Sequence, residues 1–365
     1  MAIRTQINVF SPYAGFLQGH YSDYSKNIIE KLESQKFGII NFSGNNFRKI
    51  LATSSRNILI KTHKQEGKNF CKRFLSNFIF FNKNLYKDNI PLVMLDCLPP
   101  PLCSLAYSFS LIIRKRNNVL GIIHHFPVVK KSMSFNRKLY NFCLIIFLNI
   151  MIFRGCKILT HTKHNATNDS KRIKYLNYGI NSRKLIRNYD SPRHKILFFG
   201  GLSVKKGIPR LIRVAKLLSH QGFEFNIFGK NIDINENELM QISKSYENIN
   251  IKVGFIPDSD ISKIFYKNDI LVLPYSENWE GTSGPLHLAI EYGLPIVCSK
   301  APQLEYMVKK YDIGIVTDDN RDSSLVKALL NIRFNQKDYK SNFLEGQRSN
   351  SFMKQSQTII KEIQA

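Results

Sequence analysis

The chain has 365 residues, which is long enough for two α/β domains that each bury a core of their own. Its 53 Lys and Arg against 27 Asp and Glu give a net charge of +26, which indicates an anionic partner: nucleic acid, a membrane surface or a phosphate-bearing substrate. Nucleic acid ranks lowest, because the charge is spread along the chain and no arginine-rich helix, zinc-finger spacing or RNA-binding aromatic motif is present.

The first half of the chain alternates short apolar runs with helical stretches, which predicts a parallel, doubly wound sheet. Strand Ile7–Phe10 leads into a loop with Gly15 and Gly19, and a helix follows at Asp23–Glu33. This loop comes at the carboxyl end of the first strand, where open α/β sheets bind ligands. Further strands are predicted at 37–42, 91–96, 118–124 and 156–160, and helices are predicted up to about 115 and at 139–153.

The strand at 118–124 ends in the sequence His-His-Phe-Pro. A histidine at the carboxyl end of a strand faces the ligand crevice of such a sheet. His125, with His124 as its rival, is therefore a candidate functional residue. The alternative is that both are ordinary polar loop residues.

The most apolar window, Leu139–Phe153, is too short to span a bilayer. It is bracketed by Arg137, Lys138, Arg154 and Lys157, as in a helix that lies in a membrane interface. A core helix with solvated ends is an equal alternative. A coding bias toward Lys, Asn, Ile and Phe would explain the basic excess without any partner.

The polar, basic segment Asn181–Lys195 has no apolar periodicity, so we predict that it is a linker. The pattern then restarts with strand Ile196–Phe199, the loop Gly200–Gly207 and a helix with apolar residues at helical spacing. Further strands are predicted at 225–228, 250–253, 270–273, 295–298 and 313–316, and helices near 236–246, 258–266, 284–293, 302–309, from 323, and at 351–363.

The stretch Glu280–Val297 reads as a polar loop, a helix and a strand. Pro285 is tolerated in the first turn of a helix, and Gly293 with Pro295 ends it. A loop of small residues before a helix start offers free N–H groups and the positive end of the helix dipole, which together favour an anion. An ordinary crossover turn is the alternative.

In their order, these motifs resemble the donor-binding domain of GT-B glycosyltransferases of the group 1, family 4-like type. The matching segments are I-L-F-F-G-G-L-S-V-K-K-G-I-P-R-L-I, F-N-I-F-G-K, I-K-V-G-F-I-P-D-S-D-I-S-K-I-F-Y-K-N-D-I-L-V-L-P and E-G-T-S-G-P-L-H-L-A-I-E-Y-G-L-P-I-V, which cover most of residues 195–300. The first half is similar only in pattern.

The resemblance implies an α/β GT-B fold, in which two doubly wound, parallel-sheet (Rossmann-like) domains face a cleft. Residues 1–185 would form the acceptor-binding domain and residues 186–345 the nucleotide-sugar donor-binding domain. Residues 346–365 would form a C-terminal helix that crosses back to the first domain.

The resemblance also implies catalytic roles. Charge develops on the β-phosphate when the nucleoside diphosphate leaves, and Lys206, with Lys205 as the fallback, would neutralise it. Glu280, with Glu277 as its rival, would contact the transferring sugar. His125 would hydrogen-bond the donor or assist deprotonation, since an imidazole titrates near neutral pH.

Two departures from the family's pattern concern donor binding. The donor-binding residues that the resemblance implies are Gly15, Gly200, Gly201, Lys205, Lys206, Gly229, Phe255, Ile256, Thr282, Ser283, Gly284 and Leu288. Gly201 stands where an Arg is usual, and Leu288 stands where a Glu grips the nucleotide ribose. Leu288 cannot accept a hydrogen bond, and Glu291, nearly one turn further on, is a poor substitute.

No metal or cofactor is expected beyond the nucleotide-sugar co-substrate. The sequence Asp258-Ser259-Asp260 imitates a metal-binding D-x-D motif, but it stands where a helix N-cap belongs, so we interpret it as capping. The six cysteines are scattered without a C-x-x-C pair, which argues against zinc and for reduced thiols in a cytosolic protein. No signal peptide fits the first residues.

The predicted function is a metal-independent hexosyltransferase that acts in the cytoplasm, either free or peripherally at the inner face of the cell membrane. Its donor would be a UDP-sugar or GDP-mannose, and its acceptor a saccharide, in particular a lipid-linked one, in cell-surface polysaccharide or lipopolysaccharide synthesis. Two alternatives stay open: a non-catalytic nucleotide-sugar-binding partner subunit of a glycosyltransferase, and a GT-B-fold nucleotide-sugar epimerase or hydrolase.

Overall fold

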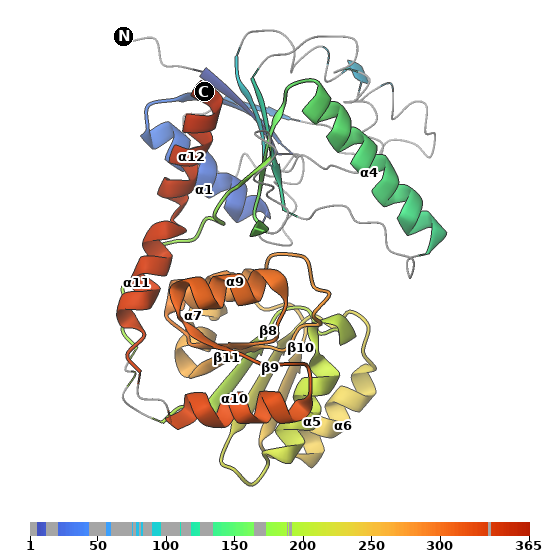
Figure 1. The fold of residues 1–365 in the computed structure, drawn as a ribbon, viewed down its shortest axis with the longest axis vertical. Coiled ribbons are helices and arrows are strands. Elements are labelled where there is room, and N and C mark those ends of the chain that lie inside the picture. Colours follow the sequence, from blue (N-terminus) through green and yellow to red (C-terminus); the bar gives the residue numbers. More distant parts are fainter. Residues whose placement is uncertain are drawn as a thin grey trace. The chain divides into compact units, whose positions relative to one another are not determined.

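The chain divides into two compact units, drawn in Figure 1: residues 1–179 with 352–365, and residues 180–351. The computed structural model describes residues 6–11, 21–43, 56–59, 75, 78–79, 82, 90–95, 110, 118–124, 134–163, 173–187, 189, 192–334 and 337–365. The boundaries predicted from the sequence lie after residues 185 and 345, whereas the structure has them after Gly179 and Ser351.

The first unit is built on a parallel sheet with the strand order β3-β2-β1-β4-β5-β6-β7. Its strands are β1 (Gln6–Ser11), β2 (Gly38–Ser43), β3 (Arg56–Leu59), β4 (Leu92–Met94), β5 (Val119–Ile123), β6 (Lys157–Thr160) and β7 (Ile173–Tyr175). Its described helices include α1 (Tyr21–Ser34), α4 (Phe135–Phe153) and α12 (Phe352–Gln364). The central strands read as apolar runs because helices cover both faces of a parallel sheet.

Helix α12 packs beside α1, although more than 300 residues separate them in the sequence (Figure 1). Gln355 Nε2 donates to Tyr24 Oη at 2.7 Å, and Tyr24 Oη lies 3.3 Å from His161 Nε2. Lys174 Nζ lies 2.9 Å from the buried carboxylate of Glu362. These polar contacts fix the last helix on the first unit.

The second unit is built on a parallel sheet with the order β10-β9-β8-β11-β12-β13. Its strands are β8 (Lys195–Phe199), β9 (Glu224–Gly229), β10 (Ile249–Val253), β11 (Ile270–Leu273), β12 (Ile296–Cys298) and β13 (Gly314–Val316). Its α-helices are α5 (Ile208–Leu217), α6 (Glu236–Ser245), α7 (Asp258–Lys267), α8 (Gly284–Tyr292), α9 (Pro302–Tyr311), α10 (Asp322–Phe334) and α11 (Lys340–Ser349). The strand order reverses between β8 and β11, and doubly wound sheets bind ligands at such a reversal.

The prediction that residues 181–195 form a linker is wrong, because the described part of this segment packs on the second unit. Leu185 and Tyr189 are buried, and Tyr189 Oη donates to Gly293 O at 2.8 Å. Arg187 donates to the carbonyls of Phe265 and Asn268 at the end of α7. Arginine side chains attach this segment to the second unit by donating hydrogen bonds to carbonyl groups at helix C-termini. Such polar contacts produce no apolar periodicity in the sequence, so the segment was interpreted as a linker.

Two further local predictions need correction. Helix α11 was not predicted, because its buried face contains only Phe343, Gly346 and Gln347. The capping interpretation of Asp258 and Asp260 is also wrong: both lie in the first turn of α7, its N-cap is Pro257, and no side chain caps it. Their carboxylates still interact favourably with the positive end of the helix dipole. No group of three or more His, Cys, Asp or Glu in the described part of the chain could hold a metal ion.

Replacing Arg183 with Met is expected to lower the free energy of unfolding at pH 8 by about 2 kcal/mol. Glu291 is buried, and its carboxylate accepts hydrogen bonds from the Arg183 guanidinium and from the N–H of Asn181. Truncating a fully buried pair costs about 3–5 kcal/mol, and Arg183 is partly exposed, so we expect less. Urea denaturation of the wild type and the variant measures the difference.

The loss of unfolding free energy in the Arg183→Met variant should become smaller as the pH falls from 8 to 5. Burial raises the pKa of Glu291 above its ordinary value, and removal of Arg183 raises it further, so the carboxyl group takes up a proton in the folded variant as the pH falls. The double variant Arg183→Met/Glu291→Gln is the control and should recover most of the loss. Equal losses at pH 5 and pH 8 would contradict this account.

Candidate functional site

The candidate site lies at the reversal of strand order in the second unit. The carboxyl end of β8 continues into the loop 200–207, and the carboxyl end of β11 continues into the loop 274–283. Ser276 N donates to Lys205 O at 3.0 Å, which joins the two loops. Both predicted donor-binding stretches therefore meet at one edge of the sheet.

Glycines let the backbones of this edge approach closely. Gly229 has φ +154°, and a Cβ atom there would lie 1.7 Å from Gly200 O. Gly207 has φ +74°, and a Cβ atom there would lie 1.9 Å from Pro274 O. Only glycine fits at either position, because every other residue carries that Cβ.

Lys206 projects into the space between the two loops. The Ser203 side chain caps the short 3₁₀ helix η4 (Val204–Lys206) by accepting from Lys206 N at 3.2 Å. Lys206 Nζ lies 5.5 Å from the ring centroids of both Tyr275 and Trp279. Burial lowers the pKa of Lys206, and none of the described carboxylates forms a salt bridge with it. A partly buried cation without a counter-ion among the described residues is the main electrostatic feature of this edge.

The N-terminus of α8 lies against the same loop. A Cβ atom on Gly200 would be 3.3 Å from Pro285 Cγ and 3.5 Å from Lys206 Nζ. Ser283 caps α8 through its side-chain oxygen, which accepts from Leu286 N and lies 3.2 Å from Tyr275 Oη. This contact orients the buried Tyr275 ring toward the helix start.

Three N–H groups at this helix start are available to a ligand. Within the described residues, no acceptor pairs with the backbone N–H of Thr282, Ser283 or Gly284. A Cβ atom on Gly284 would meet nothing within 4 Å, so the space in front of the helix is open. Free N–H groups, the helix dipole and the Lys206 ammonium all favour negative charge, so this edge can hold a phosphate group.

The other predicted residues of the second unit surround this edge. Gly254 N donates to Gly229 O, which brings Phe255, two-thirds exposed, to the neighbouring loop, while Ile256 is buried. Leu288 is partly buried on α8. The remaining residues are Gly201, packed against Ile232, the exposed Lys205 and Glu277, and the partly buried Glu280.

Two predicted residues, Gly15 and His125, lie outside the described residues. His124 is described and is buried in the first unit, where its Nε2 lies 3.0 Å from Leu95 O. Its ring packs against Tyr24 and His161, with centroids 4.9 Å away in both cases. His124 therefore belongs to the core of the first unit.

Tyr275 and Trp279, the two aromatic neighbours of Lys206, were not predicted from the sequence. A signal was present, because Trp279 is the single tryptophan of the chain and lies in a polar loop after a buried strand. An aromatic residue in such a loop is available to a ligand or to a cation, and here it contacts the cation.

Residues 183–343 match the family described as Glycosyl transferases group 1. The matched residues lie in the second half of the chain. The match covers the glycine loop, Lys206 and α8, and it confirms the resemblance stated from the sequence. No curated protein sequence matches the chain.

Several solved structures have a fold similar to that of the chain over nearly its whole length. Sucrose-phosphate synthase from Thermosynechococcus elongatus has a TM-score of 0.71 at 12% identity, covering 98% of both chains. The glycosyltransferase WaaG of lipopolysaccharide biosynthesis has a TM-score of 0.65 at 13% identity, covering 98% of this chain and 99% of its own. HepE from Anabaena, in complex with UDP and glucose, has a TM-score of 0.68 at 12% identity, covering 99% and 100%. The chain has the GT-B fold, as predicted.

Proposed function

We propose that this chain moves a hexose from a nucleotide-sugar donor to a saccharide acceptor. The observation that carries the proposal is the partly buried Lys206 ammonium, which has no described counter-ion and lies beside the free N–H groups of the α8 N-terminus. A nucleoside diphosphate is the leaving group that such a site stabilises. HepE, a structural neighbour, has been solved with UDP and with UDP-glucose.

In the proposed reaction, the bond between the sugar anomeric carbon and the β-phosphate oxygen breaks, and negative charge develops on that oxygen. The anomeric carbon forms its new bond to an acceptor hydroxyl oxygen, which loses its proton. Lys206 neutralises this charge, while Thr282, Ser283 and Gly284 donate backbone hydrogen bonds to the diphosphate. The rings of Tyr275 and Trp279 keep water from the ammonium, which strengthens its attraction for the phosphate. Glu280 would contact the sugar, His125 would assist at the acceptor side, and no metal ion takes part.

The donor nucleotide would be held without a ribose carboxylate on α8. Leu288 offers no hydrogen-bonding atom, and the carboxylate of Glu291 is already bound by Arg183. The base and the diphosphate then supply the affinity. We propose a UDP-sugar ahead of GDP-mannose as donor, and a lipid-linked saccharide as acceptor, at the inner face of the cell membrane.

A thermal-shift panel tests the donor site. UDP, GDP, ADP and their common sugars are each added to the wild-type chain. One nucleoside diphosphate should stabilise it selectively, by about 2.7 kcal/mol at 100 times its dissociation constant. Inorganic phosphate at the same concentration is the control and should shift the melting temperature little. If no nucleotide shifts it, the donor-site assignment fails.

One alternative is supported by a specific observation. Leu288 and Gly201 replace two polar residues of the family's pattern, which would suit a partner subunit that binds a nucleotide sugar without turning it over. Selective stabilisation by a nucleotide, without transfer to any of several saccharide acceptors, would favour that function. Consumption of the donor without an acceptor would instead indicate an epimerase or hydrolase.

A further inference from the structure

Helix α4 is apolar on two opposite faces. On its inner face, Leu144, Phe147, Leu148 and Met151 are buried, and the last three pack into the core formed with β1, β4, β5 and β6. These positions are spaced i, i+3, i+4 and i+7, as expected for one face of a helix. The inner face accounts for the attachment of α4 to the sheet.

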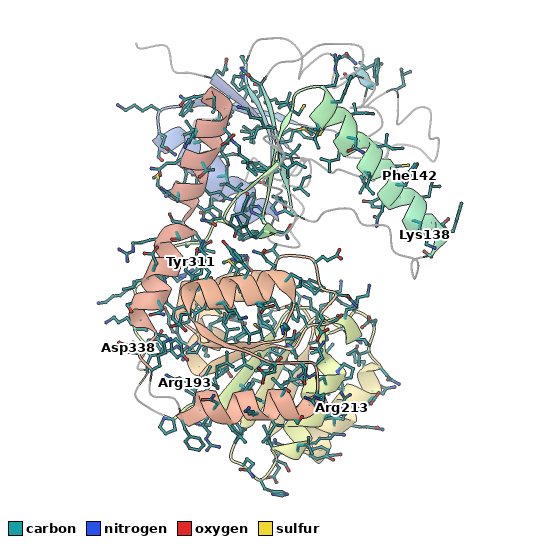
Figure 2. All side chains as sticks on the ribbon, viewed as in Figure 1. Lys138, Phe142, Arg193, Arg213, Tyr311 and Asp338 are labelled. Carbon is teal, nitrogen blue, oxygen red and sulfur yellow. The ribbon has the colours of Figure 1, made fainter. Side chains whose placement is uncertain are left out.

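The outer face of α4 carries a second apolar stripe. Its members are Phe135, Leu139, Phe142, Ile146 and Phe153, which are 78%, 52%, 55%, 41% and 83% exposed. The spacing of 4, 3, 4 and 7 residues places them within a narrow sector of the helix, opposite the buried residues. Figure 2 labels Phe142 and Lys138, one turn apart on this helix. An exposed apolar stripe on the side of a helix that faces away from the core indicates a contact with something other than water.

The charge of the protein is concentrated in the unit that contains α4. The first unit has 29 Lys and Arg against 8 Asp and Glu, whereas the second unit has 24 against 19. The segment 97–168, which includes α4, contains ten Lys and Arg and not one acidic residue. The interpretation that the charge is spread along the chain therefore needs correction.

We propose that the outer stripe of α4 inserts into the interface of an anionic lipid membrane. The apolar stripe supplies buried area, and the surrounding basic residues supply attraction to anionic headgroups, which are the two contributions that stable peripheral binding requires. A second copy of the chain would bring an equally basic unit against this one. A nucleic-acid duplex would be bound through its phosphates by the basic residues and would leave the Phe and Leu side chains in water.

The dimensions of α4 suit a helix that lies in the plane of the interface. Its 19 residues span about 28 Å along the helix axis. None of the helices in the described part of the chain combines the length and apolar character that a membrane crossing needs. The biological role of this membrane binding rests on the proposed function, since a lipid-linked acceptor is presented at such a surface. The binding itself can be measured without the reaction.

Vesicle co-sedimentation of the full chain tests the proposal. The wild type should bind vesicles of phosphatidylcholine with phosphatidylglycerol at least about tenfold more tightly than vesicles of phosphatidylcholine alone, and added salt should weaken the binding. The double variants Leu139→Glu/Phe142→Glu and Leu139→Ser/Phe142→Ser should each lose about tenfold or more in affinity. The serine pair keeps the charge unchanged, so it isolates the apolar contribution.

The matched control is Leu217→Glu, which changes an apolar residue of α5 in the second unit that is 66% exposed. It should bind vesicles as the wild type does. All variants should keep the nucleotide-induced thermal shift, so a failure of vesicle binding is distinguishable from a failure of the donor site. Vesicle binding by the serine pair equal to that of the wild type, or a wild-type dimer that the serine pair abolishes, would overturn the proposal.

Discussion

Replacing Lys206 with Met is expected to abolish nucleotide-induced stabilisation and to lower sugar transfer by a factor on the order of 10²–10³. The same substitution should raise the free energy of unfolding by about 1 kcal/mol. The opposite directions have one cause: the ammonium is partly buried without a described counter-ion, which disfavours the ligand-free fold and favours an incoming phosphate. Initial-rate kinetics and urea denaturation measure the two effects.

The stability gain should depend on pH in a defined direction. Burial lowers the pKa of Lys206 in the folded chain below that of an unfolded lysine, so the unfolded state holds the proton more tightly. The penalty is therefore complete at pH values below both pKa values and disappears as the pH rises past the ordinary pKa of lysine. Lys205→Met, at the exposed neighbour, is the control and should change neither property strongly. A Lys206 variant that is less stable than the wild type at pH 7 would contradict this account.

Replacing Gly207 with Ala is expected to prevent the second unit from folding, with a loss of more than about 4 kcal/mol. The added Cβ would lie 1.9 Å from Pro274 O and 2.8 Å from the carbonyl carbon of the same residue. Both atoms belong to the backbone between β11 and the loop 274–283, so neither can rotate away. Soluble yield and the midpoint of urea unfolding measure the effect.

Gly222→Ala is the matched control for this substitution. Gly222 has φ +67°, close to the +74° of Gly207, so the two substitutions impose the same left-handed backbone strain. The nearest neighbour of a Cβ on Gly222 is Arg333 Nη2 at 3.4 Å, which can move. The control should lose only about 1 kcal/mol. If both variants unfold at the same urea concentration, the backbone collision is not what requires glycine at 207.

The strands of the second unit and the position of the anion site could be predicted because their signals are local. Buried parallel strands are continuous apolar runs. The small residues Thr282 to Gly284 directly before a helix indicate a helix N-terminus with free N–H groups. The contacts of Lys206 were not predictable in the same way. Its aromatic neighbours come from a loop about 70 residues further along, and only the pairing of β8 with β11 brings them together.

Polar packing accounts for the remaining errors. The segment that contains Arg187 and Arg193 was interpreted as a linker, although both side chains satisfy carbonyl groups of the second unit. Helix α11 was missed for the same reason, since the buried Gln347 makes hydrogen bonds to the carbonyls of Ile290 and Glu291 where an apolar side chain would have been recognised. Buried hydrogen bonds leave no periodic pattern in a sequence.

The membership of α12 in the first unit sets an order for folding during synthesis. Residues 352–365 complete the unit that begins the chain, and they are translated after every residue of the second unit. The ribosome therefore delivers all of residues 180–351 before the surface that α12 covers on α1 can be closed. Domains usually fold in the order in which they are made. Here the second unit is the first that can finish, and until residues 352–365 have been made the nascent first unit exposes the surface of α1 that α12 later covers.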